Sequence, residues 1–472
     1  MHILSGLRRT YALDPRSLAL FRIGLGATLL SDLLLRLRDF AEFYLETGLL
    51  PGARVLAAQA GSGRWSLYLW SAEPSWTVGL WVLSVLSALC LLLGVKARAA
   101  AALSWVLLVS LHGRNPLVLQ AGDGLLRLLV LWSAWLPIDQ RWALRPGRAP
   151  AALTTAVGTA GLTLQVVLMY ASTVILKSGR AWHEEASAVY YALSIEPLTT
   201  DAGRWLLSLG PSVTGALTRL AYWTEALLPV LLICPAAVAV CRSGAVLAGV
   251  VFHLALGMMM HLGLFPLIDV VSLLPFIPAG VWAVTGRSGS GGAVLPAVRA
   301  VAWTRACAAA GLVVIGLTFW SCLSGLRWIP RPPESVRRLI ATLYLEQRWS
   351  MFAPYPLTFS GWYEATGRTV DGRRVNLIDP DRAPDLARPP ERRPWYYRDQ
   401  RWTKYMLHLA GRRSVAQSRA LTRYLCRRST ERLVSADLYF VRRRTPSPKG
   451  GRPVWSRERL YRHRCAEDHP PG

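Results

Sequence analysis

Charged residues are scarce in this chain of 472 residues. Asp, Glu, Lys and Arg together make up 17% of the sequence, whereas an ordinary soluble domain carries about 25%. Hydrophobic residues account for 52%, and the mean hydropathy is +0.29. This composition excludes a chain that lies wholly in water, and it excludes a disordered chain. A protein embedded in a membrane is the class that remains.

Cysteine is rare too. The seven cysteines form no C-x-x-C pair and no Cys/His metal spacing, so we predict no metal site. Most of them lie in or beside apolar runs, where cysteine behaves as a small core residue: Cys90, Cys234, Cys241, Cys307 and Cys322. Cys426 and Cys465 are able to pair if their part of the chain faces an oxidising compartment, and their spacing leaves this open.

Long apolar runs are absent from the C-terminal part, and charge is concentrated there. Residues 1–336 hold 25 basic and 15 acidic residues, whereas residues 337–472 hold 29 and 13. The sequence therefore predicts two parts, a membrane bundle over residues 1–330 and an extramembrane basic domain over residues 331–472. The basic excess is divided between loops and this C-terminal domain, so we expect no nucleic-acid partner.

Nine apolar runs have about the length of a membrane span. They cover residues 17–37, 76–95, 99–113, 116–137, 153–176, 216–240, 244–262, 264–285 and 301–324. We therefore predict a mainly α fold, a polytopic membrane helix bundle of about nine spans. The first run follows Arg8, Arg9 and Arg16 and lacks a small-residue cleavage site, which is typical of an uncleaved first span.

Basic residues in the short loops predict the orientation in the cell membrane. They gather in the loops that share a side with the N-terminus: Lys96, Arg98, Arg141, Arg145, Arg148, Arg242, Arg287 and Arg299. Such loops usually face the cytoplasm, so we expect the N-terminus and the linker 286–292 (GRSGSGG) on the cytoplasmic side. The partners that we expect for the spans are membrane lipids. An odd number of spans then places residues 331–472 outside.

The C-terminal domain reads as a small α+β unit. Residues 362–378 predict a hairpin around Asp371-Gly372, a pair suited to a turn with both central residues at positive φ. Apolar residues recur at helical spacing between positions 398 and 428, and Leu438 and Phe440 belong to a final strand.

An ionisable group inside a span is costly and therefore marks a candidate site. The candidates are Arg22, Asp32, Asp123, Arg127, Glu225, His253 and Asp269. Structural roles remain open for several of them. Asp123 and Arg127 stand four residues apart and are able to pair on one helical face. Arg22 could form an ion pair with Asp269 or Glu225.

Lys177, at the end of the fifth apolar run, has a common structural interpretation. A lysine at a span end usually extends its ammonium to the membrane surface. Trp182 and Tyr190, shortly after it, are typical of interface anchors. A single His253 inside a span is typical of a hydrogen-bonded packing residue.

The order of several motifs nevertheless resembles the horizontally transferred transmembrane (HTTM) domain family, which includes the vitamin K-dependent gamma-carboxylase. The matching segments are LALFRIGLGATLL, RNPLVLQAGDGLLRLLVLW, the segment from Lys177 to Trp182, YWTEALLPVLL and FHLALGMMMHLGLFP. In the C-terminal domain they are QRWSMFAPYP, the DGR…NLIDP hairpin and RWTKYMLHLA…LTRYLC.

This resemblance implies a membrane enzyme that carboxylates glutamate side chains of a peptide or protein substrate. Its cofactor would be a reduced naphthoquinone of the vitamin K or menaquinone type, with oxygen and carbon dioxide as co-substrates. Lys177 would be the catalytic base that activates the quinol, because a desolvated lysine loses its proton most readily. His253 would transfer a proton or orient the intermediate.

Four further residues take supporting or substrate-binding roles in this interpretation: Glu225, Trp182, His112 and Tyr190. Two other classes of function stay open. One is a non-enzymatic membrane scaffold or transporter, although no internal repeat typical of a transporter is evident. The other is an enzyme that uses the same pocket on a lipid or another small molecule.

Overall fold

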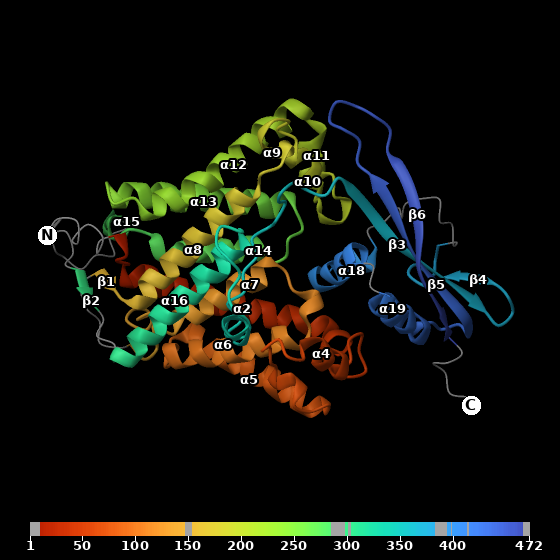
Figure 1. The fold of residues 1–472 in the computed structure, drawn as a ribbon, viewed down its shortest axis with the longest axis horizontal. Coiled ribbons are helices and arrows are strands. Elements are labelled where there is room, and N and C mark those ends of the chain that lie inside the picture. The colour runs from red at the N-terminus through yellow and green to blue at the C-terminus, as the bar shows by residue number, and fades with distance from the viewer. Residues whose placement is uncertain are drawn as a thin grey trace.

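The computed structural model describes residues 10–146, 153–284, 298–300, 304–382, 394–397, 399–412 and 415–465. The expected inner linker 286–292 and the loop residues Arg8, Arg9, Arg148 and Arg287 lie outside these ranges. The described chain forms a bundle of apolar helices that is followed by a C-terminal domain of two helices and a sheet (Figure 1).

Six helices in the described residues are long and apolar enough to cross a membrane. They are α2 (Pro15–Arg36), extended through η1 (Leu37–Asp39) and α3 (Phe40–Tyr44), α5 (Pro74–Leu93), α8 (Val157–Leu176), α12 (Pro211–Ile233), α13 (Val238–Met259) and α16 (Arg305–Gly325). Their outer faces expose large apolar side chains such as Leu86, Leu220 and Val240. Such surfaces are unfavourable in water, so the polytopic helical bundle is confirmed.

Three of the expected spans are shorter or less apolar. They are α6 (Ala97–Arg114), α7 (Ala121–Ser133) and the segment of α14 (Phe265–Leu273), η5 (Leu274–Phe276) and α15 (Ala279–Val284). The 13 residues of α7 rise only about 20 Å, less than the hydrocarbon core of about 30 Å. Pro275 and Pro278 interrupt the last segment. By length and hydropathy the count of nine spans is not confirmed.

The bundle has two ends, which we call the N-terminal end and the domain end. At the N-terminal end, β1 (Leu153–Thr155) pairs in parallel with β2 (Val298–Ala300), and Leu13 bridges Thr154. At the domain end, Arg127 of α7 donates to the carbonyl of Tyr344. Residues before the first span and the C-terminal domain therefore lie at opposite ends of the bundle (Figure 1).

The C-terminal domain contains a four-stranded antiparallel sheet in the order β4-β3-β5-β6. Its strands are β3 (Phe359–Thr369), β4 (Arg374–Asn376), β5 (Leu433–Arg444) and β6 (Val454–Arg464). The expected hairpin is β3–β4. Only Gly372 of its turn has a positive φ, 86°, so the prediction that Asp371 shares this conformation was wrong. The edge strand β6 was not anticipated, because its many arginines hide the strand pattern.

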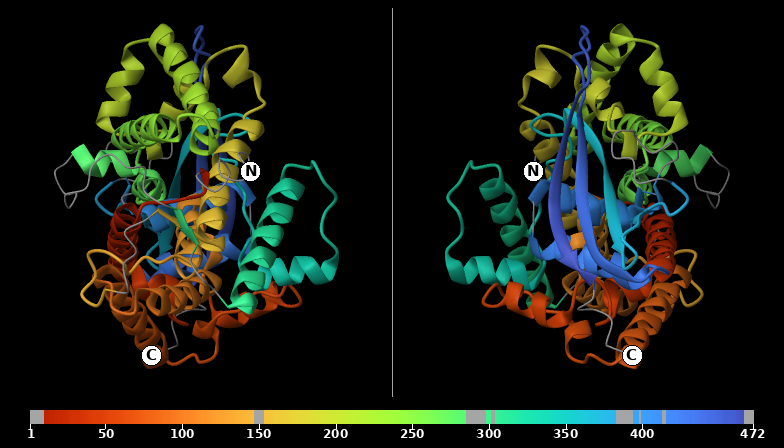
Figure 2. Two further views of the ribbon diagram at one scale, coloured as in Figure 1. Left: turned by 90° about the vertical axis from the view of Figure 1, so that its left-hand side faces the viewer. Right: turned by 90° about the vertical axis from the view of Figure 1, so that its right-hand side faces the viewer.

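Helices α18 (Gln400–Arg412) and α19 (Val415–Arg428) lie between this sheet and the bundle (Figures 1 and 2). They occupy the region where the sequence predicts helices. The Tyr363 hydroxyl of β3 donates to the carbonyl of Met406 at 2.7 Å. A disulfide joins Cys426 of α19 to Cys465 after β6. The domain is therefore the small α+β unit that the sequence indicates.

Short elements connect these parts. They are α4 (Gly52–Gln59), η2 (Leu67–Leu69), η3 (Pro116–Val118), α9 (Arg180–His183), α10 (Ala188–Leu193), η4 (Glu196–Leu198), α11 (Asp201–Ser208), α17 (Glu334–Thr342) and η6 (Trp395–Tyr397). Four of them, α4, α9, α10 and α11, lie in the half of the bundle nearer the C-terminal domain (Figure 1).

Candidate functional site

Lys177 is buried and contacts Glu225 on the neighbouring span. It follows the last turn of α8, and its ammonium forms an ion pair with a carboxylate oxygen of Glu225 on α12. The side chains are only 4% and 7% exposed. The ammonium also lies 4.4 Å from the centre of the Trp182 ring, a favourable cation–π position. Three residues that the sequence indicates are thus brought together.

The position of Lys177 does not match a snorkelling anchor. An anchor keeps its charge in water, whereas this ammonium is enclosed by protein. Burial lowers the pKa of Lys177 to about 7. Contact with an ionised Glu225 opposes this effect, so the pair can hold its proton on either partner. A lysine of this kind is able to supply a neutral amine near neutral pH.

His253 lies on α13 between two polar partners. Its Nε2 is 2.7 Å from the Tyr170 hydroxyl of α8, and its Nδ1 is 3.6 Å from a carboxylate oxygen of Asp269 on α14. All three side chains are almost completely buried. Neither carboxylate oxygen of Asp269 has a hydrogen-bond partner among the described residues. Buried polar atoms without partners are typical of sites that hold water or a ligand.

A small cavity joins these two groups. Glu225, Tyr170, His253 and Asp269 all line it, and its volume is about 30 Å³. That volume accommodates a water molecule but not an organic ring. Of the Lys177–Glu225 pair, only Glu225 lines this cavity together with the His253 group, so a proton can pass between them with one water molecule as relay.

A segment of the C-terminal domain covers Lys177. The Gly179 amide donates to the carbonyl of Pro354 at 3.1 Å, and the Trp182 indole donates to the carbonyl of Phe352 at 3.0 Å. A side-chain carbon at position 179 would come within 2.5 Å of the Pro354 oxygen. Residues 349–355, which we call the cover segment, therefore keep water from Lys177.

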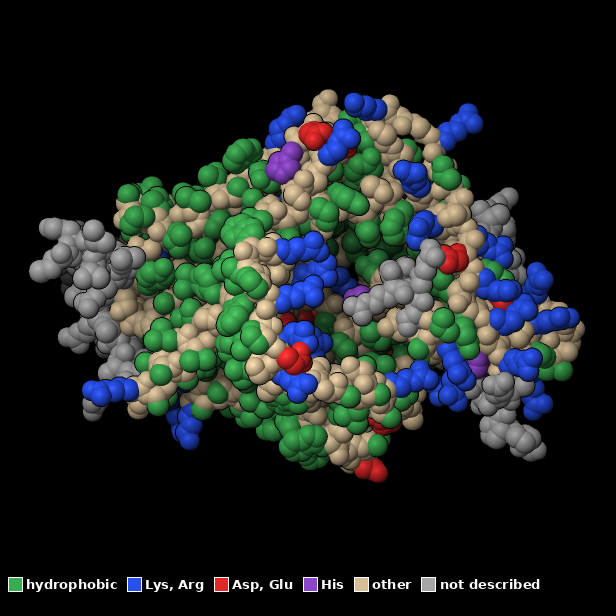
Figure 3. All heavy atoms as spheres, in the orientation of Figure 1, with side chains coloured by type: hydrophobic (Ala, Val, Ile, Leu, Met, Phe, Trp, Pro, Cys, Tyr) green, Lys and Arg blue, Asp and Glu red, His purple; other side chains and the backbone are tan. Residues whose placement is uncertain are grey.

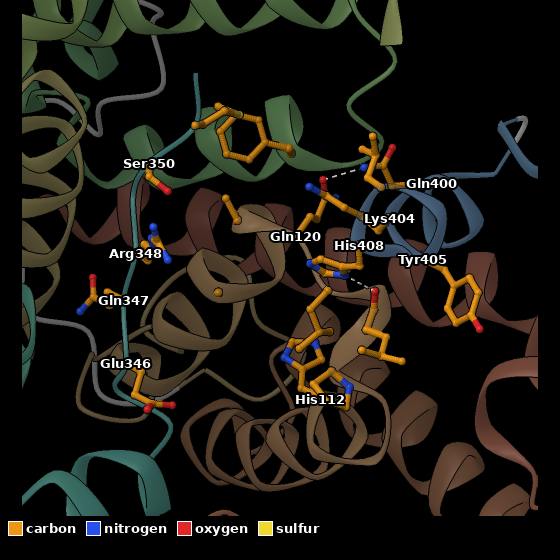
Figure 4. A pocket seen from close by; sticks show the side chains of 18 of the residues that line it. His112, Gln120, Glu346, Gln347, Arg348, Ser350, Gln400, Lys404, Tyr405 and His408 are labelled. Atoms are coloured by element: carbon orange, nitrogen blue, oxygen red, sulfur yellow. Dashed lines mark hydrogen bonds between the residues drawn. The ribbon is translucent and has the colours of Figure 1, made fainter. Parts of the chain in front are cut away.

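A second, larger cavity of about 1090 Å³ lies at the domain end. Its walls come from α6, α7 and η4 of the bundle, from the cover segment and from α18 and α19 (Figure 4). Four residues line both cavities: Ala121, Phe265, Trp349 and Met351. These four residues therefore belong to the walls of both cavities. Figure 3 shows basic side chains beside a hollow in this region.

His112 lies elsewhere, in a charged cluster between the bundle and the C-terminal domain. Its ring is 3.7 Å from the Asp123 carboxylate. The carboxylate oxygens of Asp32 and Asp123 accept hydrogen bonds from Arg36 of α2 and Arg401 of α18. His112 lines the large cavity, but the described contacts do not connect it with Lys177 or His253.

This cluster also has the geometry of a metal site, since one ligand atom from each of Asp32, His112 and Asp123 lies within 4.8 Å of the others. A cation would have to displace two guanidinium groups that already neutralise both carboxylates. The donor set therefore fits an ion-pair network that attaches α18 to the bundle rather than a metal centre.

Tyr190 is also separate from Lys177. It lies on α10, and its hydroxyl donates to the carbonyl of Pro446 at 3.3 Å. That carbonyl belongs to the connection between β5 and β6, so Tyr190 contacts the C-terminal domain. It lines neither of the two cavities.

Two pairings considered from the sequence were wrong. Asp123 pairs with Arg36 and Arg401, whereas Arg127 donates to the carbonyls of Tyr344 and Glu346. Arg22 donates to the carbonyl of Trp142 instead of meeting Asp269 or Glu225. In each case the actual partner comes from a distant segment, which helical spacing does not reveal.

Sequence reasoning missed Tyr170 and the cover segment. Tyr170 stands in an apolar run without any local signal. Trp349 and Met351 lie in the QRWSMFAPYP segment, but nothing in it indicates that it reaches a membrane helix. Comparison of the chain with protein-family models, curated proteins and solved structures finds no match.

Proposed function

We propose that this protein is a membrane-embedded enzyme in which Lys177 acts as a general base. The observation that supports this most is the burial of Lys177 against Glu225, beside a cavity that His253 and Asp269 also line. A pair of this kind exchanges one proton between amine and carboxylate without leaving an isolated charge in an apolar environment. We further propose the reaction of the gamma-carboxylase, the carboxylation of a glutamate side chain with oxygen and carbon dioxide.

The side chains divide the work as follows. When the proton of the pair is on Glu225, the amine of Lys177 is neutral and accepts a proton from the substrate side. Trp182 holds the cationic form of Lys177 through its ring face. His253, held by Tyr170, exchanges a proton across the small cavity. The cover segment excludes bulk water, which would otherwise quench a strong base.

The described cavities allow a test of fit for a reduced naphthoquinone. The small cavity of about 30 Å³ does not fit a two-ring system, whereas the large one of about 1090 Å³ does. Its apolar end would hold the ring, through Leu198, Leu262, Phe265, Met351 and Phe352. A bound quinol would supply the electrons that reduce oxygen and so drive the removal of an unactivated γ-proton.

The location that we propose is the cell membrane, with the N-terminus inside and residues 331–472 outside. The separation of the two ends of the bundle agrees with this arrangement. The disulfide between Cys426 and Cys465 supports an oxidising compartment for the C-terminal domain. A peptide substrate would then reach the large cavity from the outer side.

The test is quinol turnover by purified protein carrying Lys177→Arg. Guanidinium stays protonated at neutral pH, so we expect the variant to fold, to bind a naphthoquinone and to lose oxygen-dependent quinol consumption. Lys96→Arg is the matched control, because Lys96 also stands next to a long helix but at the N-terminal end. Wild-type turnover by Lys177→Arg would exclude Lys177 as the base.

A protein that only forms a scaffold or transports a solute gives a different result. In that case the wild type consumes no naphthoquinol in aerobic buffer, whereas both lysine variants still fold. Ligand identification by mass spectrometry of the mildly solubilised protein adds an independent readout. A copurifying menaquinone supports the enzyme, and a lipid in its place supports the alternative that the pocket acts on a lipid.

A further inference from the structure

The large cavity has a cationic wall that the chemistry above does not use. Lys404 of α18 lines the cavity, and its ammonium makes no hydrogen bond or ion pair with the described residues. Burial lowers the pKa of Lys404, the nearby Asp123 carboxylate opposes this shift, and Arg401 adds to it. The side chain is partly buried, so an anion in the cavity would be a favourable direct partner for this ammonium.

The neighbouring Asp123 carboxylate attracts Lys404 electrostatically but forms no ion pair with it among the described residues. Asp32 and Asp123 already pair with Arg36 and Arg401, which leaves this cluster with two negative and two positive charges. Lys404 is an additional positive charge beside a balanced network. The positive charge of Lys404 must therefore be balanced by an anion in the cavity or solvated by water.

The other basic residues on the wall are engaged or solvated. Arg64 pairs with Glu346, and Arg127 donates to two backbone carbonyls. Arg54 and Arg348 are exposed. Lys404 is therefore a cation at this cavity that is partly buried and makes no hydrogen bond or ion pair with the described residues.

A second donor lies beside it. The Gln120 side-chain oxygen accepts a hydrogen bond from Gln400 at 2.9 Å, which leaves the Gln120 amide NH₂ as a donor. That NH₂ has no acceptor among the described residues. Figure 4 shows Gln120 and Lys404 close together on the same side of the cavity. One ammonium and one amide match a carboxylate, whereas proteins more often hold a phosphate dianion with arginines or several cations.

Another part of the cavity wall is apolar. Ile195, Leu198, Leu262 and Phe265 belong to one buried hydrophobic cluster, and Met351 packs against it. A ligand that contacts both parts of the wall carries a carboxylate on an apolar chain. We propose that the large cavity binds such an organic carboxylate, with Lys404 and Gln120 as its anchoring residues. This inference does not depend on the redox chemistry proposed above.

Binding of hexanoate tests the proposal without any turnover. Calorimetry on the full chain in nanodiscs should detect saturable binding of hexanoate, and binding of hexanamide should be much weaker because the neutral amide has no charge for Lys404. Lys404→Met keeps the shape of the side chain and removes its charge. It should raise the Kd for hexanoate about tenfold or more, with an unchanged or higher unfolding temperature. Lys449→Met, in an exposed turn, is the control and should bind like the wild type.

Each other outcome overturns the proposal. Equal affinity of the wild type and Lys404→Met for hexanoate would show that Lys404 anchors nothing. Equal binding of hexanoate and hexanamide would show a purely apolar site. Saturable binding of inorganic phosphate at this wall, without binding of hexanoate, would identify a different anion. Absence of saturable hexanoate binding to the folded wild type also contradicts the inference.

Discussion

Arg401 in the C-terminal domain forms an ion pair with Asp32, which lies 369 residues earlier inside the first span. The same guanidinium pairs with Asp123 of α7. If the domain only lay on the surface of the bundle, the Arg401 guanidinium would not be buried against carboxylates of the bundle helices. The C-terminal domain is therefore a structural part of the membrane unit, and it supplies walls of the cavity at the domain end.

We predict that Arg401→Met strongly destabilises the protein. The substitution leaves two buried carboxylates with one guanidinium, and breaking a buried ion pair typically costs about 3–5 kcal/mol. The apparent unfolding temperature should fall by several degrees. Arg419→Met, on the exposed face of α19, is the control and should have little effect.

A second substitution separates charge balance from packing. Adding Asp123→Asn to Arg401→Met removes one negative charge and should restore part of the lost stability. If the double variant is as unstable as the sum of the single variants, the charge balance of this cluster is not what attaches the domain.

The pH dependence of turnover should follow Lys177. Because the neutral amine is the base, turnover should rise between about pH 6 and pH 8, around the pKa of about 7. Lys177→Met should show no such rise. A turnover that is independent of pH across this range would contradict the assignment of Lys177 as base.

Stability should also depend on the protonation of Lys177. Its pKa is lower in the folded protein than the ordinary 10.5, so the unfolded chain binds more protons between pH 7 and 10.5. Stability therefore increases as the pH rises through this range. The wild type should gain unfolding temperature relative to Lys177→Met from pH 7 to pH 10. A constant difference between the two would mean that the lysine keeps its ordinary pKa.

Gly179→Ala tests the cover segment. The added carbon meets the Pro354 carbonyl at 2.5 Å, so residues 349–355 must move away from Lys177. We expect reduced turnover and faster hydrogen exchange within these residues, with the helices unchanged. Gly244→Ala in α13 is the control, because a carbon at that position meets no atom within 4 Å. Full activity of Gly179→Ala would show that the close contact is not required.

Orientation in the membrane can be measured by cysteine labelling. In a background without the five free cysteines, Lys449→Cys should react with a membrane-impermeant maleimide in intact cells. Leu144→Cys, exposed at the N-terminal end, should react only after the membrane is opened. The reverse pattern would invert the proposed topology.

The sequence by itself determined the class of fold. Apolar runs of membrane-spanning length indicate helices, because a helix satisfies its own backbone hydrogen bonds in lipid. The Asp371-Gly372 pair predicts the β3–β4 hairpin, and helical spacing of apolar residues predicts the helical region of the C-terminal domain. It also singled out Glu225 and His253, because ionisable groups are rare inside apolar spans, and the family resemblance added Lys177 and Trp182. Local pattern is enough for such features, since each depends on residues a few positions apart.

Tertiary structure decided which of these residues meet. The pairing of Lys177 with Glu225, of His253 with Tyr170 and of Asp32 with Arg401 joins helices that are distant in the chain. It likewise decided that Tyr190 and His112 lie away from Lys177 and that the cover segment lies over it. Hydropathy reports the environment of a residue but not its partner, because a buried charge is satisfied by whichever opposite charge the helix packing brings within reach.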